Sequence, residues 1–98
     1  MTPIDVLKAA RDKVAANWGQ GASLYRADSK ALCSLEALDK SGPTEKLRFE
    51  AAKLLRNVID DNILRWNDKR GRTKQEVLAA FDRAIIKAEE GIDAENIN

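Results

Sequence analysis

The sequence contains no histidine and only one cysteine, and each shortage excludes a class of site. Without histidine the chain lacks the commonest general base and the commonest neutral metal ligand. A single cysteine, Cys33, permits no intramolecular disulfide and cannot by itself hold zinc. We therefore expect no metal site, no cofactor and no catalytic residues, which predicts that the protein is not an enzyme.

Long apolar runs and an excess of one charge are missing as well. No apolar run approaches the roughly 18–20 residues that a membrane-crossing helix needs, and residues 1–5 lack the pattern of a signal peptide. The 17 basic and 16 acidic residues nearly cancel, so the overall charge favours neither nucleic acid nor a membrane surface. Together with the single cysteine, these absences predict a cytoplasmic protein that is not bound to a membrane.

What the sequence does contain is helical periodicity. Its 98 residues, 44% of them hydrophobic and 34% charged, are expected to form one domain with a charged surface. A first helix is predicted between the N-cap Thr2 and the terminator Gly19. A short second helix should begin near Asp28 or Ser29 and end at the turn of residues 41–43.

The third predicted helix is the longest and runs from about Thr44 to Arg65. Its apolar residues form a broad stripe at helical spacing: Leu47, Ala51, Leu54, Leu55, Val58, Ile59, Ile63 and Leu64. Because this stripe is both long and wide, we expect it to belong to the central helix on which the others pack.

A fourth helix is predicted after a polar segment. Thr73 and Glu76 have the spacing of a capping box, in which each side chain bonds the backbone N–H of the other. The helix should end at Gly91, and residues 92–98 are expected to form an acidic, frayed tail. The predicted fold is therefore all-α, a single compact domain of about four helices over residues 1–91.

Side chains with reactive potential do not converge in this sequence. Cys33 stands in an apolar turn, where a buried thiol acts as a small hydrophobe rather than a nucleophile. The carboxylates at residues 60–61 and 89–90 are adjacent, and neighbours on a helix point about 100° apart. These pairs are therefore interpreted as solvated helix faces.

Residues 65–74 form the most informative stretch, with five basic residues, one acidic residue and a tryptophan in ten positions. An arginine beside an aromatic residue suits a protein-binding hot spot or a nucleic-acid backbone. The candidate partner-binding residues are Arg65, Trp66, Asp68, Lys69, Arg70, Arg72 and Lys74. Two alternatives stay open, since Trp66 also suits a cap on the core, and the acidic end of the chain also suits folding back on this loop.

Three segments resemble motifs of a family of small, uncharacterised bacterial and phage proteins. Residues 17–21 contain W-x-Q-G, residues 31–38 contain C-x-x-x-A-L, and residues 66–77 contain W-N-D-x-x-G-R-T-x-x-E-V. The resemblance implies a compact, mostly helical domain. It supplies no substrate, cofactor or catalytic residue, because the family it points to is a domain of unknown function.

The leading functional hypothesis is a non-enzymatic protein–protein interaction module, such as a small regulator or inhibitor encoded by a phage or mobile element. The alternative is a nucleic-acid-binding accessory protein that uses the basic loop at residues 65–74. The near-neutral charge counts against this alternative. The protein partner is not identified by the sequence, and the oligomeric state stays open.

Overall fold

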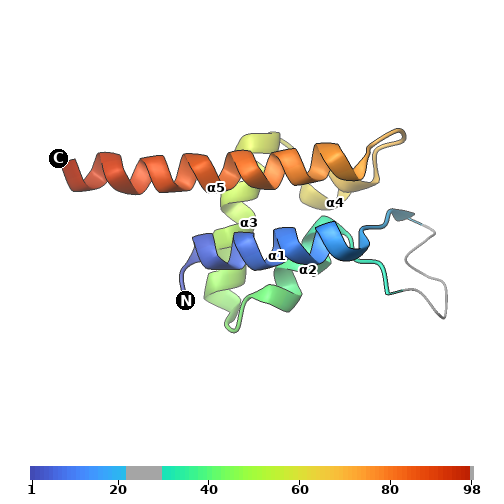
Figure 1. Ribbon diagram of the computed structural model, residues 1–98, viewed down its shortest axis with the longest axis horizontal. Helices are drawn as coiled ribbons and strands as arrows, with labels where there is room; N and C mark the ends of the chain where they lie inside the picture. The colour runs from blue at the N-terminus through green and yellow to red at the C-terminus, as the bar shows by residue number, and fades with distance from the viewer. Residues whose placement is uncertain (22–29, 98) are drawn as a thin grey trace.

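Five helices follow one another in the computed structural model, which describes residues 1–21 and 30–97, with side chains described as far as Gly91 (Figure 1). They are α1 (Pro3–Asn17), α2 (Ser34–Ser41), α3 (Glu45–Ile59), α4 (Ile63–Asp68) and α5 (Lys74–Ile97). The described residues contain no β-strand, so the all-α class is confirmed, whereas the count of four helices is wrong.

The extra helix arises because the long helix predicted over residues 44–65 is broken. α3 ends at Ile59, since Asp60 adopts the left-handed conformation with φ 53° and ψ 43°. Aspartate tolerates this region better than most residues. Asn62 then caps α4, because its side-chain oxygen accepts a hydrogen bond from the backbone N–H of Arg65 at 3.1 Å. The apolar stripe continues across the break because Ile63 still packs into the core.

The second helix begins later than the sequence predicted. Its predicted start, Asp28 or Ser29, lies outside the described residues, and α2 begins only at Ser34. Leu32, which falls within the predicted second helix, instead forms a parallel bridge with Trp18. Its N–H donates to the Asn17 carbonyl at 2.8 Å, and its carbonyl accepts from the Gly19 N–H at 3.1 Å. This bridge ties the chain after α1 to the chain before α2.

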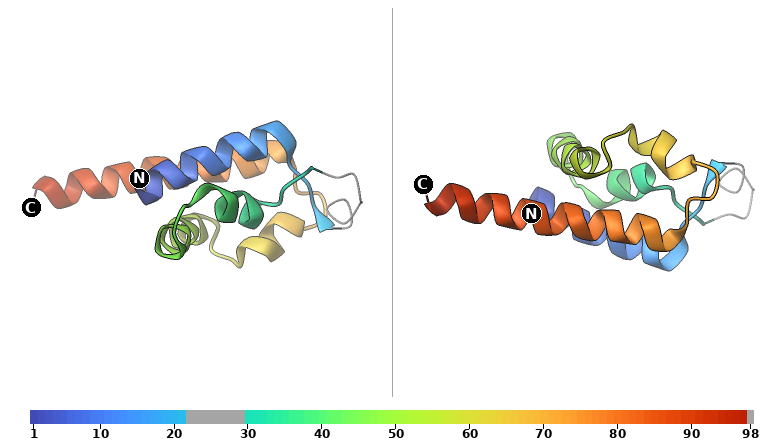
Figure 2. Two further views of the ribbon diagram at one scale, coloured as in Figure 1. Left: turned by 90° about the horizontal axis from the view of Figure 1, so that it is seen from below. Right: turned by 90° about the horizontal axis from the view of Figure 1, so that it is seen from above.

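The helices lie in two layers, with α1 and α5 in one and α2, α3 and α4 in the other (Figure 2). α1 and α5 run antiparallel side by side, and α3 crosses beneath them (Figures 1 and 2). α3 contacts each of the other four helices, as expected of a central helix, but it is not the longest, because α5 has 24 residues and α3 has 15.

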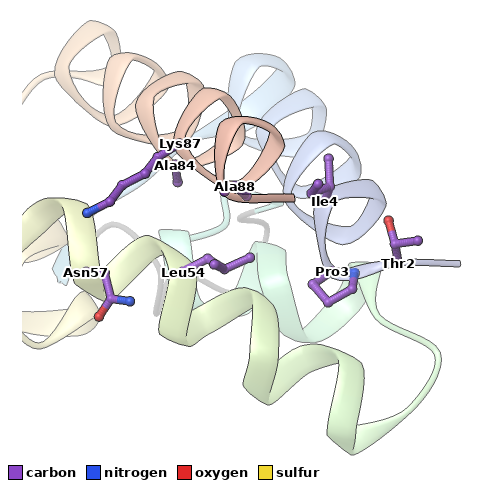
Figure 3. A pocket seen from close by; sticks show the side chains of 9 residues that line it. Thr2, Pro3, Ile4, Leu54, Asn57, Ala84, Lys87 and Ala88 are labelled. Carbon is purple, nitrogen blue, oxygen red and sulfur yellow. The ribbon is translucent and has the colours of Figure 1, made fainter. Parts of the chain in front are cut away.

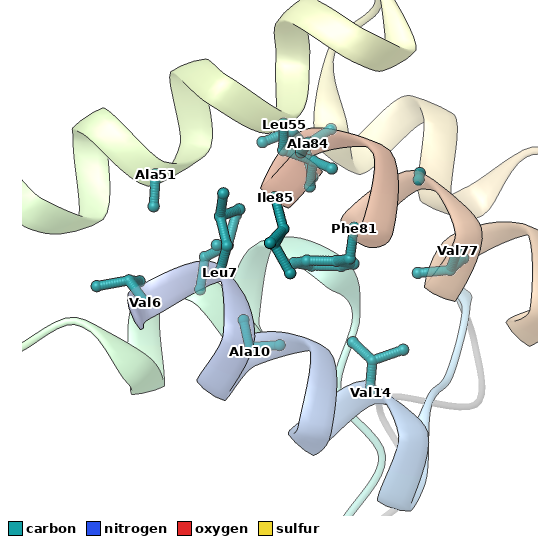
Figure 4. Packing of buried hydrophobic residues seen from close by; sticks show 14 residues of the cluster. Val6, Leu7, Ala10, Val14, Ala51, Leu55, Val77, Phe81, Ala84 and Ile85 are labelled. Atoms are coloured by element: carbon teal, nitrogen blue, oxygen red, sulfur yellow. The ribbon is translucent and has the colours of Figure 1, made fainter. Parts of the chain in front are cut away.

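The core lies between the two layers, where Phe81 of α5 packs among side chains of α1 and α3 (Figure 4). α1 contributes four fully buried side chains at helical spacing, Val6, Leu7, Ala10 and Val14. Burying a side chain of the size of leucine or phenylalanine contributes about 1.5–3 kcal/mol, so this cluster is the main support of the fold.

The two predicted capping features of the first and last helices are present. Thr2 and Asp5 form a reciprocal capping box at α1, and Thr73 and Glu76 form one before α5. α5 continues past Gly91, where the sequence predicted its end, and the fraying of the acidic tail stays a prediction. Among the described helices, none combines the length and the hydropathy needed to cross a membrane.

Candidate binding site at residues 65–74 and the polar cluster beneath it

The fully buried side chain of Asn67 is the centre of a hydrogen-bonded cluster. Its Oδ1 accepts from the indole Nε1 of Trp18 at 2.7 Å, and from the backbone N and Oγ of Ser34 at 2.9 and 2.6 Å. Its Nδ2 donates to the carbonyl of Gly19 at 3.1 Å and to Asp68 Oδ1 at 3.0 Å. One asparagine therefore joins the end of α1, the start of α2 and α4.

The segment after α1 reinforces this junction. Gln20 Nε2 donates to the carbonyls of Asn67 and Lys69 at 2.8 and 2.9 Å, and the N–H of Gly21 donates to Asp68 Oδ1 at 3.1 Å. We call this group the Asn67 cluster: Trp18, Gly19, Gln20, Gly21, Ser34, Asn67 and Asp68. Within the described residues no buried side-chain nitrogen or oxygen lacks a partner, so the cluster is fully satisfied.

The Asn67 cluster explains the three sequence motifs in physical terms. Its members come from the three segments at residues 17–21, 31–38 and 66–77 that carried the resemblance. Asn67 was not among the candidate residues predicted from the sequence, so its role was missed. The available signal was a tryptophan beside polar residues in two of the three segments, at residues 17–21 and 66–77, which a solvent-exposed turn does not require.

Two of the predicted binding residues hold the loop together. The Arg72 guanidinium lies 4.0 Å from the centre of the Trp66 ring, and its Nε donates to the carbonyl of Trp66 at 3.0 Å. It also pairs with Glu76 at 3.0 Å, which leaves the Arg72 side chain only 12% exposed. Trp66 itself packs against the core. Both residues therefore serve folding.

Three more of the predicted residues also have partners within the chain. Arg65 pairs with Asp61 at 2.6 Å, a hydrogen bond that lowers the pKa of that carboxyl, although the Arg65 side chain stays 78% exposed. Lys74 Nζ donates to the carbonyl of Ala15 at 3.1 Å. Asp68 belongs to the Asn67 cluster. All three residues are exposed, yet each already has a partner within the chain.

Lys69 and Arg70 remain as the outward-facing cations of the loop. Both are exposed, and neither side chain has an ion pair or hydrogen bond within the described residues. The helix N-terminus beside them already has an anion, because the Glu76 carboxylate accepts the Thr73 N–H at 3.1 Å. That hydrogen bond lowers the pKa of Glu76. The backbone amides at the start of α5, which would otherwise attract an anion, thus have one supplied from within the chain.

A second surface, which the sequence reasoning did not identify, lies beside Arg65. Phe49 of α3 is 63% exposed and Leu64 of α4 is 45% exposed. They flank a groove of about 150 Å³ whose wall includes Leu35, and the Arg56 guanidinium lies 5.8 Å from the Phe49 ring. The signal in the sequence was that Phe49 falls off the apolar stripe of its helix. We call Phe49, Arg56 and Leu64 the Phe49 surface.

The one cysteine is buried, as expected. Cys33 is 2% exposed, and burial raises the pKa of its thiol, while its sulfur accepts the Glu36 N–H at 3.4 Å as the cap of α2. Nowhere in the described part of the chain do three histidine, cysteine or acidic side chains gather as metal ligands would.

Comparison with known proteins places the chain in a family without supplying a function. No curated protein and no solved structure matches it. A family model does match, over residues 1–87, which takes in the Asn67 cluster, the Phe49 surface and most of α5. The chain therefore belongs to a family of unknown function, DUF6197.

Proposed function

We propose that the protein is a non-enzymatic module that binds another protein through the Phe49 surface. The observation that supports this is the exposure of Phe49 and Leu64 on either side of one groove. Scattered exposed apolar residues are ordinary on a protein surface, but two large ones around a shared groove are typical of an interaction site.

The composition of the surface supports the same proposal. Protein-binding hot spots are enriched in aromatic residues and arginine, and here the Arg56 guanidinium lies over the Phe49 ring. The charged tip at Lys69 and Arg70 would then serve as a polar contact that steers the encounter. We propose that the module acts as a small regulator or inhibitor in the cytoplasm, encoded by a bacterium, phage or mobile element.

The nucleic-acid alternative has less support. Of the five basic residues in the loop, Arg72 and Lys74 have internal partners, Arg65 pairs with Asp61, and the start of α5 is capped by Glu76. Two free cations release few counterions, so they provide little affinity for a nucleic-acid backbone.

The test is affinity capture from a lysate of the source organism, with and without nuclease. A Phe49→Ser/Leu64→Ser variant runs beside the wild type, and a Lys69→Glu/Arg70→Glu variant runs as the second comparison. Both pairs of side chains are exposed, so the helicity and the free energy of unfolding of the variants should stay close to those of the wild type.

The proposal predicts a protein that is retained after nuclease treatment and lost in the Phe49→Ser/Leu64→Ser variant. The charge-reversal variant should weaken capture and reduce its dependence on salt. Retention that disappears with nuclease, falls steeply with salt and depends on Lys69 and Arg70 would establish nucleic-acid binding instead. Retention of the partner by the Phe49→Ser/Leu64→Ser variant would move the contact away from this surface.

A further inference from the structure

A cleft of about 300 Å³ opens between the first turn of α1, α3 and α5 (Figure 3). Its floor is apolar, formed by Ile4, Leu54, Ala84 and Ala88. It shares no lining residue with the groove of the Phe49 surface. The cleft is therefore a separate feature, and its function does not depend on the proposal made above.

Small side chains on α5 create the space. Ala84, Ala88 and Gly91 follow at helical spacing along the side of α5 that lines the cleft. A Cβ added at Gly91 would meet no atom within 4 Å, so the cleft is open at this end. Leu54 of α3 faces these residues from across the cleft (Figure 3).

The charge at the cleft has one sign. Among the residues whose side chains the structure describes, Lys87 is the only charged one that lines the cleft, and none of them is acidic. The Lys87 side chain extends toward Asn57 at the rim (Figure 3). Glu90 shares the adjoining groove with Lys87, yet the described residues contain no ion pair between them. The ammonium group is thus available to an anion, and the apolar floor next to it is available to a hydrocarbon.

We propose that this cleft binds a small anionic amphiphile, with an unbranched apolar tail on the floor and a carboxylate at Lys87. The volume argues for a small molecule, because about 300 Å³ is at the lower end of ligand pockets. A partner helix presents a row of anchors at successive turns and needs a longer groove. Complementarity of charge selects a carboxylate over a neutral or cationic head group.

The test is a titration of the whole chain with sodium octanoate below its micelle concentration, followed by amide chemical shifts. Saturable shifts are expected at Ile4, Leu54, Ala84 and Ala88. Hexanoate should bind about tenfold more weakly, because it buries two fewer methylene groups. Octanol, which lacks the charge, should bind about threefold to fivefold more weakly than octanoate.

Two variants and a matched control complete the test. Lys87→Gln should weaken octanoate about threefold to fivefold and leave octanol unchanged, whereas Lys53→Gln, an exposed lysine of α3 outside the cleft lining, should change neither. Gly91→Leu should fill the open end and reduce binding of both ligands. Shifts spread over the whole surface, equal binding of octanoate by the Lys87→Gln variant, or binding of an acidic amphipathic peptide without octanoate would overturn the proposal.

Discussion

The Asn67 cluster and the two grooves use their residues in opposite ways. In the cluster every buried polar atom is paired inside the chain, and the motif residues of three distant segments meet around one asparagine. Around the grooves, the exposed Phe49 ring and the Lys87 ammonium face solvent, and Lys87 has no ion pair among the described residues. The most distinctive sequence motif of this chain therefore stabilises the fold. The surfaces suited to binding lie on helices whose sequences carry no distinctive motif.

The neighbouring residues Arg70 and Arg72 show the same contrast within one loop. They look equivalent in the sequence, but Arg72 stacks on Trp66 and pairs with Glu76, whereas Arg70 has no partner in the described structure. The composition of the segment therefore identifies a charged loop. It does not show which of the charged residues stabilise the loop and which are free to contact a partner.

The largest expected effect is at the centre of the cluster. Asn67→Ala should lower the free energy of unfolding by about 3 kcal/mol or more, because it leaves the Trp18 indole N–H, the Ser34 N–H and the Gly19 carbonyl without partners. Urea denaturation measures this. The matched control is Asn57→Ala at an exposed asparagine, which should cost less than about 0.5 kcal/mol. An equal loss of unfolding free energy in the two variants would show that the Asn67 cluster does not stabilise the fold more than an exposed asparagine does.

The two arginines should differ next. Arg72→Ala removes a stacking contact and two hydrogen bonds, so it should cost about 2 kcal/mol of unfolding free energy. Arg70→Ala should change that free energy by less than about 0.5 kcal/mol. Thermal and urea denaturation of both variants in one buffer measure this difference in unfolding free energy. A destabilised Arg70 variant would show that Arg70 also stabilises the fold.

Two glycines should respond with opposite signs. Gly71 in the polar loop has φ 86°, so Gly71→Ala should destabilise the fold by about 1 kcal/mol. Gly91 lies within α5 beside the cleft with open space around it, so Gly91→Ala should stabilise the fold by about 0.5–1 kcal/mol. Melting temperatures would give the signs directly, and a loss of stability at Gly91 would contradict the open geometry of the cleft.

The smallest effect concerns pH. The hydrogen bond from the Thr73 amide lowers the pKa of Glu76 below its ordinary value of 4.5. The contribution of this carboxylate to stability is therefore complete above pH 4.5 and is lost as the pH falls through the folded-state pKa. Glu76→Gln should lose less stability than the wild type between about pH 5 and pH 3, which denaturation across that range measures. An unchanged slope would show that the cap does not hold in solution.

The sequence predicted the helical class because the stripes and caps are local signals. The caps at Thr2 and Thr73 are confirmed, since each depends only on residues three positions apart. The break at Asp60 was missed because the apolar period continues across it to Ile63. The end of α5 was placed too early because a glycine alone does not stop a helix.

The candidate site was predicted less well than the fold. Residues 65–74 do form a charged loop, yet five of the seven named residues have internal partners. Arg65, Trp66 and Arg72 have theirs within the neighbouring turns of the chain. Asp68 and Lys74 instead bond to Gly21 and Ala15, which lie 47 and 59 residues away in the chain. Such contacts are set by packing and are not visible in local spacing. The exposure of Phe49 was likewise missed, although its position off the apolar stripe indicated it.

The central claim, that Asn67 joins distant segments to hold the fold, is tested most directly by a double-mutant cycle between Trp18→Phe and Asn67→Ala. The cycle isolates the hydrogen bond from Trp18 Nε1 to Asn67 Oδ1 at 2.7 Å. We expect a coupling free energy of about 1 kcal/mol or more, since each variant removes the partner of the other. Additivity within about 0.3 kcal/mol would show that the two side chains do not depend on each other, and would contradict the claim.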